Sequence, residues 1–528
     1  MSKELEYFAR KVVSGLMDRR AFMGRAAALG ASAVMANTLL SNATHAQEPK
    51  KGGHLKLGLG GGESSNSLDP ALTLSQAPYN VIAQIGDQLV EVNPEGGLDN
   101  RIAEEFSSSP DAKVWSFKIR QGVVFHDGTA LTSDDVLKTM QRHSDEKATS
   151  GALGIMKGIE SMRAEGDLFE VTLTDPNADL AYLMADRHLR IQPGGGIDDP
   201  ANGVMSGPYR IVEDEPGVRH TFEKFADYWD DSRGHFDSTE ILIINDATAR
   251  MSALQSGRVQ LANLIEPKIA ELLARAPGVN LERTEGRGQN VFVMHVDTAP
   301  FDNNDLRLAL KYAIDREELV EKILRGYGTV GNDIPVNIAY PFFDETIPQR
   351  AFDLDKAAEH YKKSGHDGSP IVLRVADVAF PGAVDAAQLF QQTAQKAGIP
   401  LEIEREPGDG YWSEVWNNKP FCASYWGGRP TQDQMYATAY LSSAEWNDTR
   451  FKNEEFDSLL MQARAELDPD KRKALYSQMS YMVRDEGGLI MPMFNDFLDA
   501  RTDAVAGWVS NPNGDMMNDL AAVKCWQA

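Results

Sequence analysis

The chain has 528 residues, with 53 Lys or Arg against 78 Asp or Glu, and a formal net charge of −25. Such an acidic surface repels phosphate backbones and anionic lipid headgroups, so we expect neither nucleic acid nor a membrane surface as a partner. Two cysteines are too few for a disulfide-dense scaffold. Cys422 and Cys525 either form one bridge in an oxidising compartment or stay two buried thiols, and the sequence leaves both open.

The N-terminal residues resemble an export signal. Residues 18–23 read DRRAFM, the twin-arginine pattern, and a soft apolar stretch follows over 26–40. Thr44, His45 and Ala46 place small residues at the two positions that a signal peptidase inspects. We predict that residues 1–46 are a twin-arginine signal peptide. The alternative is an amphipathic surface helix; a membrane span needs roughly 20 apolar residues, more than this stretch holds.

The first half of the mature chain mixes short strands and helices. Alternating apolar residues predict strands over 54–59, 115–119, 169–173 and 240–244. Turns are predicted at 66–70, 127–128 and 206–209, and helices over 81–90, running into a short strand, and 247–255. Thr132 followed by Asp135 predicts a capping box that opens a helix at Asp134.

The second half indicates parallel crossovers. An apolar strand is predicted over 290–295, and Asp302 is expected to cap the helix whose apolar face contains Leu306, Leu310 and Ala313. A strand over 371–375, a helix over 384–397 and a strand over 401–403 follow the order of a parallel strand–helix–strand unit. A further helix opens at Asp468-Pro469. Together these elements predict α/β lobes rather than a barrel or a bundle.

Several motifs resemble those of the bacterial extracellular solute-binding proteins of family 5, the peptide/nickel group, and they occur in the family's order. The most specific is the stretch 103–136, with the strand, the Asp127-Gly128 turn and the capped helix. The others are SLDP at 67–70, SGPY at 206–209, YW at 228–229, QSG at 255–257, DLRLALKYAIDR at 305–316, and the helix at 453–463.

The resemblance implies a two-lobed type II periplasmic-binding fold with a hinge and the ligand between the lobes. Lobe I is expected over 47–295 plus 496–528, with an extra subdomain near 90–230, and lobe II over 296–495. It also implies a periplasmic receptor, a monomer with no cofactor, that delivers peptides or peptide-like solutes to an ABC importer's permease. Ligand contacts with both lobes would stabilise the closed state.

The resemblance places the ligand beside residues 421–433, and there the chain departs from the family. Peptide-binding members carry W-x-x-D, whose aspartate pairs with the peptide's ammonium group, whereas Arg429 stands at that position here. An arginine prefers a carboxylate or a similar anion. Either the ligand is anionic at this end, or Asp433 takes the amine role in a shifted register. In a third interpretation, Arg429 points away from the ligand and forms a salt bridge with an acidic residue at the surface.

Other candidate ligand-binding residues surround this region. Tyr425 and Trp426 flank the loop, and we expect Trp426, with Trp412 and Trp446, to form walls of the site, although core packing would use the same residue types. The resemblance places Ser75 and Gln76 where family members touch the ligand backbone. Asn495, near the second predicted hinge crossing, is a further candidate, against the alternative of a plain loop residue.

The sequence contains no G-x-S-x-G, H-E-x-x-H or G-x-x-x-x-G-K-[ST] motif, so we predict a binder rather than an enzyme. His126 stands beside the Asp-Gly turn, and we expect a structural hydrogen bond rather than a catalytic role. Two alternatives remain: an exported hydrolase with an unrecognised carboxylate pair, and a receptor for nickel or a metal chelate. No metal-ligand cluster is predicted, because the histidines lack the spacing of metal ligands.

Overall fold

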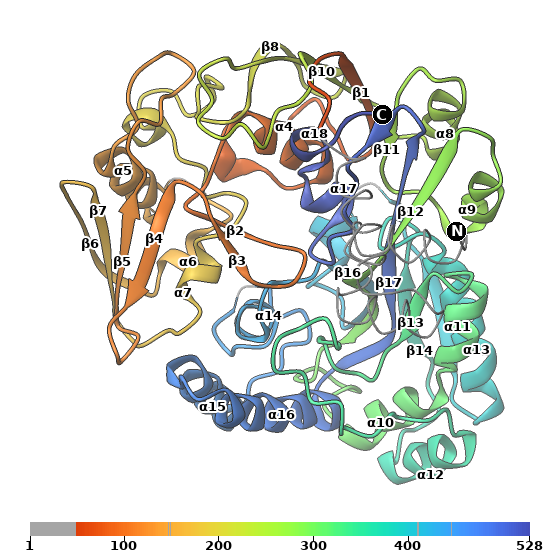
Figure 1. Ribbon diagram of the computed structural model, residues 1–528. Helices are drawn as coiled ribbons and strands as arrows, with labels where there is room; N and C mark the ends of the chain where they lie inside the picture. The colour runs from red at the N-terminus through yellow and green to blue at the C-terminus, as the bar shows by residue number, and fades with distance from the viewer. Residues whose placement is uncertain (1–48, 146, 148, 409–410, 445) are drawn as a thin grey trace, which may run out of the picture.

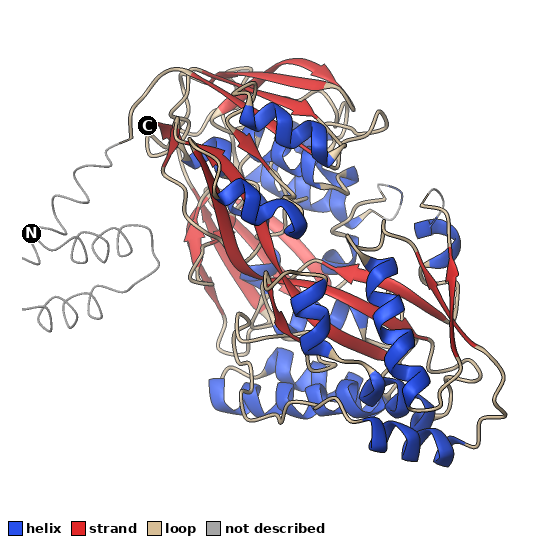
Figure 2. Ribbon diagram, turned by 90° about the vertical axis from the view of Figure 1, so that its right-hand side faces the viewer, coloured by secondary structure: helices blue, strands red, loops and turns tan. Residues whose placement is uncertain are grey.

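The computed structural model describes residues 49–528 except 146, 148, 409–410 and 445 (Figure 1). The predicted signal peptide therefore lies outside the described residues. The described chain is a mixed α/β protein built on one long sheet, with helices on both of its faces and a second, smaller sheet to one side (Figures 1 and 2).

The main sheet has eleven strands in the order β15-β14-β16-β12-β17-β11-β1-β10-β9-β8, with β13 also paired to β17. Their bounds are β1 His54–Leu59, β8 Tyr209–Glu215, β9 Arg219–Lys224, β10 Ser238–Ile243, β11 Leu261–Ala262, β12 Val279–Met294, β13 Gly328–Val330, β14 Ile371–Val375, β15 Leu401–Arg405, β16 Phe421–Trp426 and β17 Leu489–Thr502.

The two longest strands, β12 and β17, join the halves of the molecule. They pair antiparallel from Val279↔Thr502 to Thr284↔Phe497 and again from Gly288↔Asn495, with an irregular register between Thr284 and Gly288. The two paired stretches belong to different cores, because Leu498 lies in one apolar cluster and Phe494 in another. The two strands, labelled in Figure 1, thus run from one lobe into the other.

The first lobe packs β1, β10 and β11 against helices from both ends of the chain. Leu57 of β1, Ile85 of α4 and Met516 near the C-terminus share one core. The remaining elements of this lobe are the 3-10 turn η1 Pro70–Leu72, α4 Gln76–Ile85, α8 Ala247–Gln255, α9 Pro267–Ala274, α17 Asp515–Asn518, α18 Ala521–Lys524, β18 Val505–Ala506 and β19 Trp526–Gln527.

A subdomain with its own core extends from this lobe, on the left of Figure 1. Its four-stranded antiparallel sheet has the order β4-β5-β7-β6, and β2 and β3 form a separate hairpin. The elements are β2 Val90–Val92, β3 Leu98–Asn100, β4 Ala103–Ser108, β5 Val114–Ile119, β6 Ile159–Glu165, β7 Leu168–Leu173, α5 Ser133–Ser144, α6 Leu153–Met156, α7 Leu180–Leu183 and the 3-10 turn η3 Pro193–Gly196.

The second lobe has the largest apolar core, built around β12, β14, β16 and β17. β14 and β15 pair in parallel around α13, which confirms the predicted crossover unit. The helical elements are α10 Asn304–Ala313, α11 Arg316–Lys322, α12 Leu354–Ser364, α13 Ala383–Lys396, α14 Gln432–Ala439, α15 Glu454–Ala465, α16 Pro469–Glu486 and the π-turn η4 Tyr411–Val415.

The structure corrects some predicted boundaries. The first helix begins at Gln76 rather than at residue 81, because Pro78 in its first turn needs no backbone N–H partner there. The helix cap is Asn303, not Asp302: its side chain accepts from the N–H of Leu306. The capping box of Thr132 and Asp135 is confirmed, and α5 begins at Ser133.

The structure decides between the two alternatives for the cysteines. Cys422 and Cys525 are two separate buried thiols, so the bridge alternative is wrong.

Because β12 already packs into the second core at Val291, we propose that the first lobe boundary lies at 285–288 instead of after 295. We propose 89–191 for the extra subdomain, since β8 and β9 belong to the main sheet.

Candidate functional site

The loop between β16 and α14 presents Arg429 where the lobes meet. Its backbone N–H donates to the Tyr340 hydroxyl (3.1 Å), and its Nη1 donates to the carbonyls of Gly427 and Gly428 (3.2 and 3.3 Å). No described carboxylate forms an ion pair with this half-buried guanidinium. Burial lowers the pKa of Arg429, and the charge of Asp186, from the first lobe, opposes that shift. The reading in which Arg429 pairs with a surface acid therefore has no support within the described residues.

The side chain of Arg287 holds this loop in place by hydrogen bonds. It lies in the irregular stretch of β12, is 1% exposed, and its Nη1 donates to the Arg429 carbonyl (3.1 Å) and to Asn513 Oδ1 (2.5 Å). A Cβ on Gly428 would approach Arg287 Cβ to 2.2 Å, so the loop needs glycine at that position. Because Asn513 belongs to the C-terminal tail of the first lobe, Arg287 connects the crossing strand, the loop and the opposite lobe.

Three tryptophans cluster beside the loop, and Trp416 packs edge to face against each of the other two. The ring centroids of Trp416, Trp426 and Trp446 lie 6.2–6.3 Å apart, and the indole N–H groups of Trp416 and Trp426 both donate to Asp448 Oδ2 (2.9 and 3.0 Å). The Arg429 guanidinium carbon lies 5.9 Å from the Trp426 ring centroid. The structure thus brings together Trp426 and Arg429, two of the candidate residues.

The other aromatic candidates differ in exposure. Tyr425 is 53% exposed and Trp446 is 44% exposed, whereas Trp426 is buried. Neighbouring residues of a strand point to opposite faces, so Tyr425 and Trp426 do not line the same surface. The side chain of Trp412 lies outside the described part of the chain.

Asp433 is engaged elsewhere. Its carboxylate is 1% exposed and accepts from Arg464 Nε at 3.0 and 3.3 Å, on the side of α14 that faces α15. This pairing argues against Asp433 as the partner of a ligand ammonium group. It leaves the anionic-ligand reading of Arg429 as the one that the geometry favours.

The first lobe contributes the N-terminal end of α4 to the candidate site. Ser75 occupies the N-cap position without a capping hydrogen bond and donates its hydroxyl to the Gly61 carbonyl (2.6 Å), and Gln76 is the first helical residue. Tyr79, one turn later, was missed by the sequence reasoning. Its spacing from Ser75 and Gln76 on one helix is the signal that could have found it.

Arg187 was also missed, because nothing in the local sequence around residues 184–190 marks it. Its Nη1 lies 3.0 Å from Asp519 Oδ2 and its guanidinium carbon lies 4.3 Å from the Tyr79 ring centroid. Asn495 lies at the crossing of β17, where its side chain packs over Gly288.

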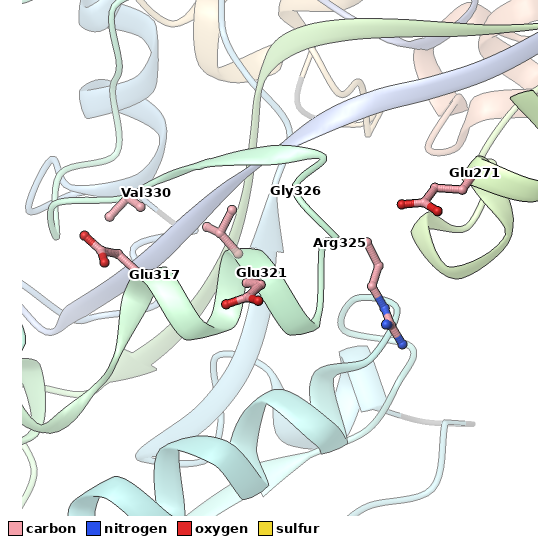
Figure 3. Close-up of a pocket in the computed structure, with 7 residues that line it drawn as sticks. Glu271, Glu317, Glu321, Arg325, Gly326 and Val330 are labelled. Carbon is pink, nitrogen blue, oxygen red and sulfur yellow. The ribbon is translucent and has the colours of Figure 1, made fainter.

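A surface hollow of about 440 Å³ lies elsewhere, between α9 and α11 (Figure 3). Glu271, Glu317 and Glu321 line it against one arginine, Arg325, and none of the predicted site residues does. Its acidic lining would repel an anionic solute. This hollow is therefore a poor candidate for the site.

The described residues contain neither a metal-ligand cluster nor a membrane-spanning helix. No group of three or more His, Cys, Asp or Glu in the described part is arranged to hold a metal ion. None of the helices over the described ranges is long and apolar enough to span a membrane.

His126 contacts the Gly207 carbonyl through its Nε2 (3.0 Å), in agreement with the predicted structural hydrogen bond.

Comparisons with known proteins agree with this architecture. Glutathione-binding protein GsiB of Escherichia coli K12 is 26% identical over 481 residues, covering 87% of this chain and 93% of GsiB. The solved structure of Helicobacter pylori DppA with the peptide STSA has a TM-score of 0.79 at 21% identity, covering 90% of this chain and 98% of DppA. AgaA from A. tumefaciens R10, in complex with agropinic acid, has a TM-score of 0.79 at 22% identity, with coverages of 90% and 99%.

These solved structures establish the two-lobed periplasmic-binding fold, which the sequence predicted. A family model described as bacterial extracellular solute-binding proteins, family 5 Middle, matches residues 97–448. The chain therefore belongs to the family 5 solute-binding proteins, the periplasmic or extracellular receptors of ABC importers.

Proposed function

We propose that this receptor captures a peptide or a small peptide-like solute that carries an anionic group. It closes its two lobes on the solute and delivers it, chemically unchanged and without a cofactor, to a permease in the inner membrane. A monomer is sufficient for this role, since both lobes belong to one chain. The relatives named above, with glutathione and agropinic acid in their descriptions, support a small solute with carboxylates.

The observation that carries the proposal is the guanidinium of Arg429. It is half-buried, it donates only to loop carbonyls, and no described acid pairs with it. A desolvated cation favours a ligand that supplies the missing negative charge, and a guanidinium grips a carboxylate with two parallel hydrogen bonds. Asp433, the other candidate charge, is already paired with Arg464.

The proposal is tested on protein purified from the periplasm with its natural solute. Native mass spectrometry should find a bound small molecule, and its mass should stay constant after release and renewed incubation with the protein. A solute that is cleaved on incubation would support the hydrolase alternative, and a metal-containing mass would support the chelate alternative. Protein that never carries a solute would contradict the proposal.

Arg429→Ala gives the site its own test. We expect the variant to bind the co-purified solute with a free energy weaker by more than about 1 kcal/mol, roughly fivefold in Kd, because a charge-assisted hydrogen bond is lost. Calorimetry with the released solute measures this. The matched control is Arg258→Ala, which removes an exposed arginine far along the chain. Equal affinity in both variants would remove Arg429 from the site.

We also propose that residues 1–46 direct export by the twin-arginine route. The support is the sequence DRRAFM and the small residues at 44–46. Replacing Arg19 and Arg20 by lysine should leave the full chain in the cytoplasmic fraction. Normal periplasmic yield of this double variant would refute the route without touching the binding proposal.

A further inference from the structure

Arg287 is a buried cation whose hydrogen-bond acceptors, within the described part of the chain, are all uncharged. Its side chain is 1% exposed, and its guanidinium donates, over 2.5–3.4 Å, to the carbonyls of Ala339, Arg429 and Pro430 and to Asn513 Oδ1. A buried charge without a counter-charge is costly, so these hydrogen bonds have to offset the desolvation of the guanidinium. The planar fork of five N–H donors suits this task, because it reaches acceptors that lie in different directions.

The acceptors of Arg287 lie on both sides of a lobe boundary. Arg287 itself belongs to residues 285–288, where the register of β12 against β17 is irregular and where we place the boundary. The carbonyl acceptors belong to the second lobe, whereas Asn513 belongs to the C-terminal tail of the first. A rotation about this stretch that separates the lobes also separates the two sets of acceptors. The full set of hydrogen bonds is therefore available only when the lobes lie close together.

Asn513 continues this connection into the subdomain. Its Nδ2 donates to the Asn93 carbonyl (3.3 Å), in the turn between β2 and β3, and to Asn511 Oδ1 (2.7 Å). Its Oδ1 accepts from Arg287 Nη1 at 2.5 Å. One asparagine thus links the β2–β3 hairpin to the guanidinium, and the guanidinium links it to the loop between β16 and α14.

The loop that carries Arg429 lies directly against Arg287. The backbone of Gly428 comes so close that a Cβ there would lie 2.2 Å from Arg287 Cβ. Tyr340 contacts both parts: its ring centroid lies 4.8 Å from the Arg287 guanidinium carbon, and its hydroxyl accepts from the Arg429 N–H (3.1 Å). Hydrogen bonds on both the N–H and the carbonyl of Arg429 therefore fix its backbone, and Arg287 supplies the donor for the carbonyl.

We propose that Arg287 is a positioning residue that makes the place of the Arg429 loop depend on lobe closure. With Asn513 in contact, the guanidinium is fixed and holds the Arg429 and Pro430 carbonyls. With Asn513 withdrawn, Nη1 loses an acceptor, and the loop loses a donor of fixed position. This role rests on the proposed function, since it takes the loop as part of the solute site. A loop that is already ordered binds a solute at a smaller entropic cost, so the closed form is the one that binds it better.

The test follows amide hydrogen exchange by mass spectrometry in the exported protein after removal of bound solute. Asn513→Ala removes the acceptor in the first lobe and changes no residue of the second. We expect the amides of residues 428–431, in the second lobe, to exchange about tenfold faster in this variant, the effect of losing a hydrogen bond to a charged group. The matched control is Asn280→Ala, whose lost hydrogen bond to Asp503 (2.8 Å) lies within the first lobe. This control should leave the loop as protected as in the wild type.

A double-mutant cycle assigns the effect to Arg287. Arg287→Lys keeps the charge, but its three donors on one nitrogen do not reach the same acceptors, so the loop should exchange faster in this variant as well. Adding Asn513→Ala to Arg287→Lys should then produce little further change, because the connection is already broken. Exchange over β14, residues 371–375 in the core of the second lobe, should stay at the wild-type rate in every variant.

Three outcomes would overturn this role for Arg287. They are wild-type exchange of the loop in Asn513→Ala, additive effects of the two substitutions, and an equal rise in exchange over β14, which would mean a general loss of stability. None of these outcomes involves a solute, so the proposed function is tested separately by native mass spectrometry. A protein that never carries a solute would contradict the proposed function and leave the coupled exchange intact.

Discussion

Asp448 is a buried carboxylate that two indoles share. Burial raises its pKa to about 6, although the hydrogen bonds from Trp416 and Trp426 act in the opposite direction. Its second oxygen, Oδ1, has no hydrogen-bond partner among the residues that the structure describes. The folded protein therefore holds a proton on Asp448 at a pH where the unfolded chain, with an ordinary pKa near 3.9, has lost it.

The sign of the resulting pH dependence follows from linkage. The protonated Asp448 carboxyl contributes to the free energy of unfolding. This contribution is fully present below about pH 4 and is lost as the pH rises through about 6. Asp448→Asn keeps an acceptor for the indoles and removes the ionisation. We expect the stability difference, variant minus wild type, to grow by roughly 2 kcal/mol between pH 4 and pH 7, from a shift of about two pKa units. Urea denaturation at each pH measures it.

The control is Asp227→Asn, which removes an exposed acid from the first lobe. Its stability difference from the wild type should vary far less with pH. If the Asp448→Asn difference were flat across the range, Asp448 would titrate in the folded protein as it does in the unfolded chain, and the tryptophan cluster would surround a charge at neutral pH.

At the scale of elements, α5 depends on its first turn. The Asp135 carboxylate accepts from the Thr132 N–H (2.9 Å) and hydroxyl (2.6 Å), and its other oxygen accepts from the Gly194 N–H (2.8 Å) of η3. One side chain thus closes the capping box and attaches the glycine turn to the helix. We expect Asp135→Ala to lower the free energy of unfolding by about 1–2 kcal/mol, the range for a lost cap.

The adjacent residue offers a matched comparison. Asp134 lies in the same turn and is 60% exposed, and within the described residues its one ion pair is with Lys138 at i,i+4. Asp134→Ala should cost less than about 0.5 kcal/mol. Denaturant unfolding of both variants distinguishes them, and similar losses would mean that helix charge, rather than the capping geometry, stabilises this end of α5.

At the scale of the whole molecule, the lobes also meet away from the arginines. Asp179, next to α7 of the subdomain, lies 2.8 Å from Arg472 of α16, and both side chains are buried. The Ala178 N–H donates to the Arg464 carbonyl (2.9 Å) beside it. This ion pair and backbone hydrogen bond join the subdomain of one lobe to helices of the other, so they require the two lobes to approach each other.

We expect Asp179→Asn to shift the solute-free protein toward the open form. The substitution leaves Arg472 buried without its counter-charge, which disfavours the closed contact. Small-angle scattering should then give a larger radius of gyration for the solute-free variant. The solute should also bind more weakly, since the apparent Kd rises as the binding-competent fraction falls. Asp199→Asn, an exposed acid of the same lobe, is the control; identical profiles would show that this contact does not bias closure.

The sequence by itself determined the local elements. Alternation over residues 115–119 gave the strand β5, the spacing of Leu306, Leu310 and Ala313 gave the buried face of α10, and Thr132 with Asp135 gave the start of α5. Each of these signals is read within about a dozen residues, where periodicity and capping act directly. The family motifs added two predictions that no local signal supports: the two-lobed fold, and Arg429 as the position where the chain departs from the peptide-binding pattern.

Only the tertiary structure decided which charges face each other. Arg187 and Asn518 are 331 positions apart, and Asp433 meets Arg464 rather than a ligand because α14 packs against α15. The extent of β12 was likewise missed, since its polar first half is a strand only through pairing with β17. Side-chain partners of this kind are set by how elements pack, and no local pattern in the chain records that packing.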